Sequence, residues 1–258
     1  MRLTLPLPLL ADALAKSGWL RFASPRACYG LAGRLLPWFW GAAALFGTAG
    51  LAAGLLVAPS DTAHGEAYRI IFLHVPATWM SMIIFLTMAA WVAVGLMLNT
   101  PLSAMLATAL APTGALMTMV ALWTGALWDR PTWGTWWVWD ARLMSQLLLL
   151  LLYLAFMAMQ ATRAEWRRTD RTGAILLLVG VANVPILFVS AQWWPTLQQG
   201  IWAGMDQPSG LVTVVAGMLL MLAALWSWSI AASLHRLRSI ILERERDSEW
   251  ARSLPEAN

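Results

Sequence analysis

The sequence predicts an all-α membrane protein with six transmembrane helices. Of its 258 residues, 60% are hydrophobic and only 12% are charged, whereas soluble domains are about 45–50% apolar and about 25% charged. Six apolar segments are close to the roughly 20 residues needed to cross a hydrocarbon core of about 30 Å. No polar region is long enough to form a soluble domain, so we expect residues 1–258 to form a single polytopic membrane domain.

The six predicted spans are separated by segments rich in residues that interrupt helices. In chain order, the spans are residues 37–58, 70–97, 102–127, 143–161, 173–190 and 211–233. The connections, in the same order, read "APSDTAHGEAYR", "NTP", "PTWGTWWVWDAR", "RAEWRRTDR" and "QQGIWAGMDQPSG". We expect each connection to reverse the chain direction between antiparallel helices.

The distribution of basic residues predicts the orientation. Of the 17 lysines and arginines, 14 lie before the first span, after the fourth span or after the sixth. They are Arg2, Lys16, Arg21, Arg26, Arg34, Arg163, Arg167, Arg168, Arg171, Arg236, Arg238, Arg244, Arg246 and Arg252. Cytoplasmic connections carry the excess of basic residues, so we expect cytoplasmic tails at 1–36 and 234–258. The tryptophan-rich connection then lies on the outer, periplasmic face.

Composition and motifs exclude several classes of function. The positive charge is explained by membrane topology, so it does not indicate a nucleic-acid partner. The lipid bilayer is an expected partner. A single cysteine, Cys28, rules out an intrachain disulfide and a CxxC motif. The sequence has no P-loop and no recognisable catalytic constellation. We therefore expect a binding protein and no enzyme.

Tryptophan is concentrated in the predicted outer connections. Of 18 tryptophans, those in these connections are Trp128, Trp133, Trp136, Trp137, Trp139, Trp193, Trp194 and Trp202. One interpretation is an aromatic belt at the headgroup level, but a belt needs only one or two rings at each helix end, on both faces. The other is a platform that stacks a large, flat, apolar ligand. We favour the platform because the run is so dense.

Charged residues beside the tryptophans refine the expected ligand. Asp140 and Arg142 end the run, and Arg69 lies at the outer end of the second span. Arginines next to an aromatic surface suit a ligand with carboxylates. Local pairing of Arg142 with Asp140, or of Arg69 with Glu66, is an equally good explanation, and the two do not exclude each other.

His74 lies about one turn inside the outer end of the second span, two residues before Pro76. An ionisable residue at membrane depth is a functional candidate, and neutral imidazole is a frequent metal ligand. A histidine that simply satisfies a neighbouring polar group is the alternative. With a flat-ligand platform on the same face, haem is the economical interpretation, and His74 is then an axial ligand of its iron.

Three motifs resemble the CcmC family of haem-handling membrane proteins from bacterial cytochrome c maturation. They are "WGTWWVWDARL" at 133–143, "YRIIFLHVPA" at 68–77 and "QWWPTLQQG" at 192–200, and the resemblance extends over about residues 30–235. It implies a multi-pass protein of the bacterial inner membrane that holds haem b transiently and non-covalently. His74 would be an axial ligand, and the tryptophan connection would hold the haem and contact a partner.

The resemblance also implies a set of partners. The expected ones are a haem chaperone that receives the haem, an ATP-binding cassette ATPase with its membrane subunit, and a small single-span subunit. Two other functions stay open: a permease that moves haem through its own spans, and a haem-free scaffold for assembly. Few polar residues lie deep in the spans, with Gln146 and Asn183 the clearest.

The sequence departs from the family pattern at one place. Family members carry a second axial histidine where this chain has Gln198, and an amide is a poor ligand for haem iron. The sixth coordination position is then open or filled by water, or it is taken by His64 or by Met205. An impaired paralogue is a further interpretation of this substitution.

Overall fold

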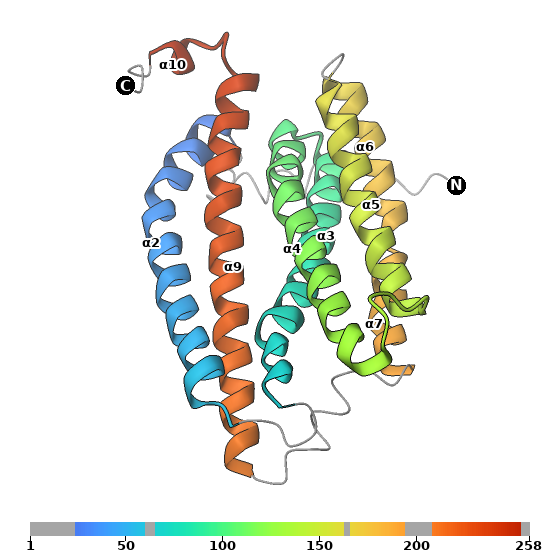
Figure 1. Ribbon diagram of the computed structural model, residues 1–258. Coiled ribbons are helices and arrows are strands. Elements are labelled where there is room, and N and C mark those ends of the chain that lie inside the picture. The colour runs from blue at the N-terminus through green and yellow to red at the C-terminus, as the bar shows by residue number, and fades with distance from the viewer. Residues whose placement is uncertain (1–23, 60–64, 163–165, 194–207, 254–258) are drawn as a thin grey trace, which may run out of the picture.

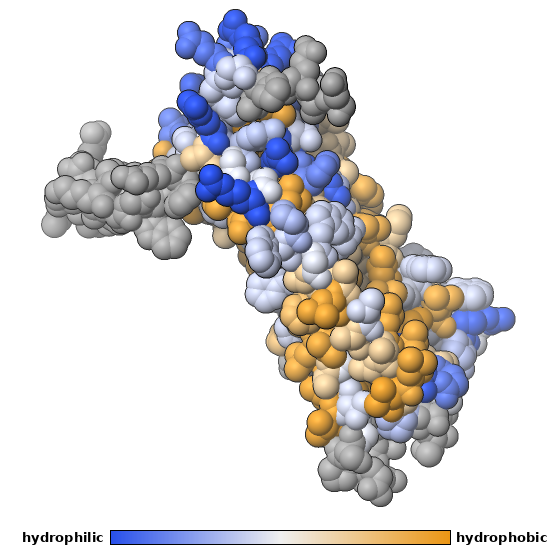
Figure 2. Space-filling model, turned by 90° about the vertical axis from the view of Figure 1, so that its left-hand side faces the viewer, coloured by the Kyte–Doolittle hydropathy of each residue, from blue (hydrophilic) through white to orange (hydrophobic). Residues whose placement is uncertain are grey.

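The computed structural model describes residues 24–59, 65–162, 166–193 and 208–253. Within these ranges the chain is helical, and six helical segments are long and apolar enough to cross a membrane. They stand side by side as one bundle (Figure 1). Apolar residues cover its middle, and hydrophilic residues gather toward its two ends (Figure 2). These observations confirm the prediction of an all-α, six-helix membrane protein.

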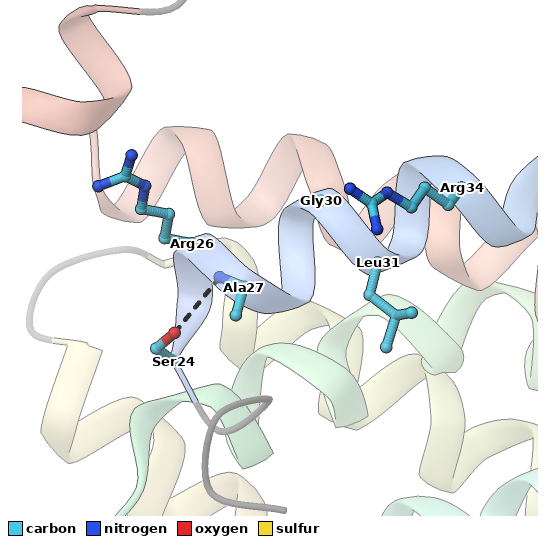
Figure 3. A pocket seen from close by; sticks show the side chains of 6 residues that line it. All are labelled: Ser24, Arg26, Ala27, Gly30, Leu31 and Arg34. Carbon is cyan, nitrogen blue, oxygen red and sulfur yellow. Dashed lines mark hydrogen bonds between the residues drawn. The ribbon is translucent and has the colours of Figure 1, made fainter. Parts of the chain in front are cut away.

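The first span begins earlier than the sequence predicted. Helix α2 (Pro25–Ala52) ends in a π-helical turn, η2 (Ala53–Val57). Its N-cap is Ser24, whose hydroxyl oxygen accepts a hydrogen bond from the backbone N–H of Ala27 at 3.3 Å (Figure 3). Proline is tolerated at the first helical position because the backbone N–H that it lacks would have no acceptor within the helix. Residues 25–36, expected as part of a tail, are therefore helical, and Arg26 and Arg34 line a hollow on this helix.

Helices α3 and α4 lie in the middle of the bundle and position the tryptophan connection. The short helix η3 (Glu66–Ile70) leads into α3 (Ile71–Leu98), and α4 (Pro101–Trp133) follows after two residues. Asn99 makes the reversal with a positive φ of 52°, a conformation that asparagine tolerates better than most residues.

The predicted end of the third span, at residue 127, is wrong. Helix α4 continues for almost two further turns to Trp133 and ends at Gly134, whose φ is 74°. The N–H of Gly134 donates to the carbonyl of Arg130 at 3.1 Å, which closes the helix in a left-handed cap that glycine adopts without strain. Pro131 did not stop the helix, so Trp128 and Trp133 belong to α4 and not to an irregular connection.

The fourth and fifth spans pack together beside α3 and α4. They consist of α5 (Ala141–Ala161), followed by α6 (Trp166–Gly180) and α7 (Asn183–Trp193), which form one interrupted span. At the interruption, the side-chain amide of Asn183 donates to the carbonyl of Ser145 on α5 at 2.9 Å. The backbone at the break is paired locally, with the N–H of Val184 donating to the carbonyl of Val181 at 3.0 Å, because lipid offers no partners.

The last span, α9 (Pro208–Arg244), runs the full height of the bundle against α2 (Figure 1). It continues through residues 234–244, which were expected as tail, and the short helix α10 (Glu249–Arg252) follows. Near its end, Arg244 forms two hydrogen bonds to the carboxylate of Asp170, at 2.8 and 3.0 Å. The ion pair joins the ends of α9 and α6. An arginine can lay its long apolar stem along a helix and keep its charged group at the membrane surface.

The buried residues form three clusters at different heights. The largest joins α3, α4, α5, α6 and α7 around Phe85 and Tyr153, whose rings meet edge to face. A second lies around Phe72 and Trp128 at the end that carries the tryptophan connection. The third lies at the opposite end, around Leu237 on α9. The second cluster forms the base of the candidate site.

Polar side chains deep in the bundle join helices to one another. The hydroxyl of Tyr153 donates to the carbonyl of Ser81 at 2.7 Å, and the amide of Gln146 donates to the Ser81 hydroxyl at 3.1 Å. These bonds connect α5 to α3, as Asn183 connects α7 to α5. Polar residues at helix interfaces serve in this way in many membrane proteins. Packing thus accounts for Gln146 and Asn183 without a route for haem.

Candidate functional site

The candidate site lies where α4 ends and α5 begins. Between them, residues 134–140 form a short connection that the structure holds by local hydrogen bonds. The guanidinium of Arg130 donates to the carbonyl of Gly134. The hydroxyl of Thr135 donates to the carbonyl of Trp137 at 3.1 Å. The connection is therefore folded onto the end of α4.

Three indoles of this connection, Trp136, Trp137 and Trp139, are called the tryptophan shelf below. Trp139 is 77% exposed and Trp136 is 56% exposed, so most of each ring is left uncovered by the rest of the described chain. The rings of Trp137 and Trp139 meet at a steep angle of 74°, with centroids 5.8 Å apart. The guanidinium of Arg130 lies 5.7 Å from the ring centre of Trp136. The shelf offers free aromatic surface with a cation beside it.

Trp128 does not belong to the shelf. It is only 4% exposed and packs in the second cluster with Tyr68, Ile71 and Phe72. Its predicted role in ligand contact rested on a place in the connection, and the extension of α4 moved it into the bundle. Its indole therefore packs inside the bundle.

Asp140 begins α5. Its carboxylate accepts a hydrogen bond from the backbone N–H of Leu143 at 2.7 Å, as an N-cap residue does. The side chain is 4% exposed. Asp140 therefore fixes the direction in which α5 leaves the shelf.

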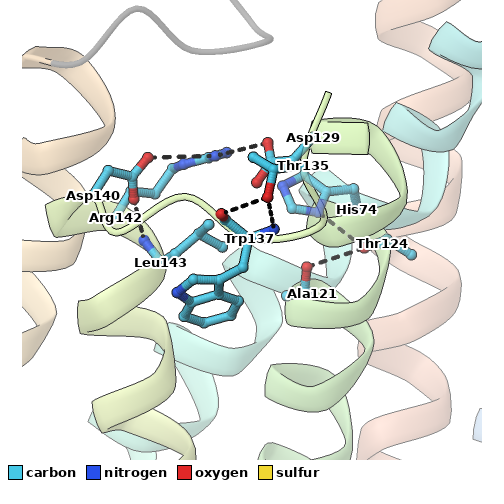
Figure 4. A network of polar contacts seen from close by, with 9 residues as sticks. All are labelled: His74, Ala121, Thr124, Asp129, Thr135, Trp137, Asp140, Arg142 and Leu143. Carbon is cyan, nitrogen blue, oxygen red and sulfur yellow. Dashed lines mark hydrogen bonds and ion pairs between the residues drawn. The ribbon is translucent and has the colours of Figure 1, made fainter. Parts of the chain in front are cut away.

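Arg142 lies between two carboxylates (Figure 4). One of its terminal nitrogens is 3.6 Å from an oxygen of Asp129 and 3.8 Å from an oxygen of Asp140. Both separations exceed the 2.7–2.9 Å of a charge-assisted hydrogen bond. The Nε of Arg142 and both oxygens of Asp129 are buried and lack a hydrogen-bond partner. The trio sets two carboxylates against one guanidinium and leaves much of its hydrogen-bonding capacity unused.

His74 lies one turn into α3, half-buried, and faces α4. Its Nδ1 is 2.9 Å from the hydroxyl oxygen of Thr124. Figure 4 shows the ring beside the end of α4, with Asp129 and Arg142 in the same network of polar residues. The structure thus brings His74 and Arg142 to one end of the bundle, below the tryptophan connection.

Arg69 lies at the same end but is engaged locally. It donates to the carboxylate of Glu66 and to the carbonyl of Gly54 in η2. Its guanidinium also lies 5.5 Å from the ring centre of Tyr68. Its pairing with Glu66 is the local alternative that the sequence left open.

The remaining predicted residues lie at or beyond the limits of the described structure. Trp133 and Trp193 end α4 and α7, and their side chains are not described. Trp194 and Gln198 fall outside the described residues, as do His64 and Met205. The identity of a second axial ligand stays a prediction.

Two residues of the site were missed from the sequence. Asp129 was hidden because the third span was expected to end at residue 127. Thr124 stands 50 positions from His74, and nothing in a single sequence pairs them. Thr124 and Trp128 are four residues apart, which is the spacing of neighbours on one face of a helix. This spacing was the only signal in the sequence that Thr124 lies near the same end of α4 as Trp128.

Comparison with known proteins decides the family. A family model described as "Heme exporter protein C" matches residues 18–252. The chain belongs to this family. It is 39% identical to the heme exporter protein C of Escherichia coli (strain K12) over 241 residues, which cover 91% of this chain and 95% of that relative. The corresponding protein of Haemophilus influenzae is 32% identical over 238 residues, covering 92% and 97%.

A relative described as mitochondrial is similar over a shorter stretch. A protein of Marchantia polymorpha described as a "putative cytochrome c biosynthesis ccmC-like mitochondrial protein" is 40% identical over 162 residues, covering 63% of this chain and 66% of that relative. The heme exporter protein C family is named for transport and not for a catalysed reaction. The expected family is therefore confirmed, and with it the expectation that the chain is not an enzyme.

Proposed function

We propose that this protein binds haem at the outer face of the bacterial inner membrane and presents it to a haem chaperone for cytochrome c maturation. The observation that carries the proposal is the placement of a half-buried histidine, His74, at the same end of the bundle as exposed indoles. Membership of the heme exporter protein C family supports haem as the ligand. Holding and hand-over, with no reaction on this chain, is the mechanism.

The tryptophan shelf supplies apolar contact for the porphyrin. Trp136 and Trp139 are free to stack against a flat ring because most of each indole is exposed. Removal of such surface from water is favourable by about 25 cal/mol per Å². A ligand on an exposed shelf stays accessible to a second protein, which hand-over requires.

Arg142 is the proposed partner of a haem carboxylate. Its Nε and the indole N–H of Trp137 are both buried donors without an acceptor, and such groups are costly to leave unpaired. Two carboxylates, Asp129 and Asp140, already face this one guanidinium at 3.6 and 3.8 Å, so a haem carboxylate binds to it only by displacing Asp129. Arg130 adds a second positive charge on the exposed side of the shelf.

Haem retention tests the role of His74. His74→Ala is compared with His235→Ala, since His235 is an exposed histidine on α9 at the other end of the molecule. We expect purified His74→Ala protein to lose its haem and His235→Ala to keep it. Equal retention in both variants would refute His74 as the iron ligand. A wild-type protein that holds no haem at all would favour the scaffold function.

The proposed partners follow from the family and from the missing energy source. An ATP-binding cassette ATPase, its membrane subunit and a small single-span subunit would form the complex, with the bundle as a component in the inner membrane. Transfer tests the hand-over. Trp139→Ala should slow transfer of haem to the chaperone, because Trp139 is the most exposed shelf indole. Unchanged transfer would argue against the shelf as the contact surface.

The second axial position has its own test. Low-spin haem spectra require two strong ligands, and Gln198 is a weak one. We expect Gln198→His to convert the spectrum of the bound haem to low spin. An unchanged spectrum would show that residue 198 does not face the iron, and His64→Ala and Met205→Ala would then be measured in the same way.

A further inference from the structure

The hydroxyl of Thr124 lies between the His74 ring and the backbone of its own helix. Its oxygen is 2.6 Å from the carbonyl oxygen of Val120, 3.2 Å from that of Ala121 and 2.9 Å from Nδ1 of His74 (Figure 4). A threonine hydroxyl has one proton to donate, and carbonyls can only accept. Two oxygens 2.6 Å apart need a proton between them, so the Thr124 proton points to Val120.

The contact between His74 and Thr124 then has one direction. With its proton committed to Val120, the Thr124 oxygen is an acceptor, and Nδ1 of His74 must be the donor. The neighbour of His74 on α4 therefore requires a proton on Nδ1.

We infer that Thr124 is a positioning residue that holds His74 as the tautomer with its proton on Nδ1 and its lone pair on Nε2. The inference rests on the proposed function, because the lone pair is the group that binds iron. Metal-binding histidines commonly donate their other ring N–H to an acceptor, which fixes the tautomer and the ring orientation and raises the basicity of the ligand. In this chain the acceptor is a hydroxyl oriented by a helix carbonyl.

The same contact fixes where Nε2 points. His74 is on α3 and Thr124 is on α4, so the hydrogen bond ties the ring to the neighbouring helix. Nε2 is separated from Nδ1 by Cε1, so its lone pair points away from the Thr124 hydroxyl. The residue as a whole is only partly buried.

A merely structural threonine is the alternative, and the same helix offers a matched control. Thr118 lies in α4, is fully buried, and its hydroxyl donates to the carbonyl of Gly114 at 2.7 Å. It makes the same intrahelical bond as Thr124. Among the described residues, its hydroxyl has no hydrogen bond to a histidine. Thr118→Val therefore removes the helix bond alone, while Thr124→Val removes that bond together with the acceptor for His74.

The first measurement uses haem-free protein. Nitrogen NMR of 15N-histidine-labelled protein in bilayers reports which ring nitrogen carries the proton, and His74→Ala identifies the His74 signals. We expect the Nδ1–H form in wild type, Thr118→Val and Thr124→Ser. We expect Thr124→Val to raise the proportion of the Nε2–H form. An Nε2–H form in the wild type, or no change in Thr124→Val, would overturn the inference.

The second measurement uses bound haem. Loss of such an outer partner typically costs about 10- to 100-fold in metal affinity, and we expect a loss in this range for Thr124→Val. A hydrogen bond from Nδ1–H adds electron density to the ligand and favours ferric iron. The reduction potential should therefore rise in Thr124→Val and return toward wild type in Thr124→Ser. An unchanged potential would refute the positioning role.

The two failures can be told apart. If His74→Ala loses haem but Thr124→Val keeps wild-type affinity, spectrum and potential, the proposed function stands and the role of Thr124 falls. If His74→Ala retains haem, His74 is not the ligand. The NMR result would then still decide the tautomer but would have no bearing on iron.

Discussion

Replacement of Trp128 with alanine distinguishes the role of the base of the site from that of the tryptophan shelf. Trp128 is 4% exposed in the cluster around Phe72, whereas Trp139 is 77% exposed. A cavity costs about 24 cal/mol per Å³, and truncation of tryptophan to alanine removes on the order of 140 Å³, so Trp128→Ala should cost about 3 kcal/mol. Lipid does not change this reasoning, because the loss is one of packing.

The assay is unfolding of haem-free protein in mixed micelles, with Trp139→Ala as the matched control. We expect the control to stay within about 0.5 kcal/mol of wild type, as exposed substitutions do, and yet to retain less haem. Trp128→Ala should show the large loss of stability before haem enters the experiment. Equal stability of the two variants would refute the assignment of Trp128 to the base.

Three smaller changes test the packing around the site. Gly54→Leu should destabilise the bundle by about 1–3 kcal/mol, because a side-chain carbon at Gly54 would lie 2.7 Å from the Phe72 ring; Gly41→Leu has open space and should leave the melting temperature unchanged. Asp140→Ala removes the α5 cap and should lower the stability by about 1 kcal/mol. It should also lower haem retention, and both quantities are measured on the same preparation. Tyr153→Phe should cost about 0.6 kcal/mol in micelle unfolding, and a loss above 3 kcal/mol would contradict a single interhelical bond.

The spans were predictable because lipid imposes a simple demand: long apolar helices with every backbone group paired. Their ends were less so. The third span was expected to end at residue 127, yet α4 continued to Trp133, where a left-handed cap at Gly134 closes it. The starts differed for a related reason. Ser24 and Pro25 begin α2 well before the apolar run, and cap chemistry is independent of hydropathy.

The candidate site was predictable in its residue types but not in its contacts. His74, Arg142 and the exposed indoles were identified because each is unusual for its place in the sequence. Which of them carries the ligand depends on burial, and burial separated Trp128 from Trp139 only once α4 was placed. The contact of His74 with Thr124 comes from the packing of α3 on α4, which no local pattern encodes.

The pairing of α2 with α9 has a consequence for biogenesis. These are the first and last spans of the chain, and α2 has little other contact: 11% of its most apolar window is buried. During synthesis the first helix enters the bilayer long before its main partner has been made, and helices associate only after insertion. Among the described spans, α2 therefore lacks its main partner until α9 is made. The bundle reaches its final arrangement only when α9, which ends at Arg244, has been inserted.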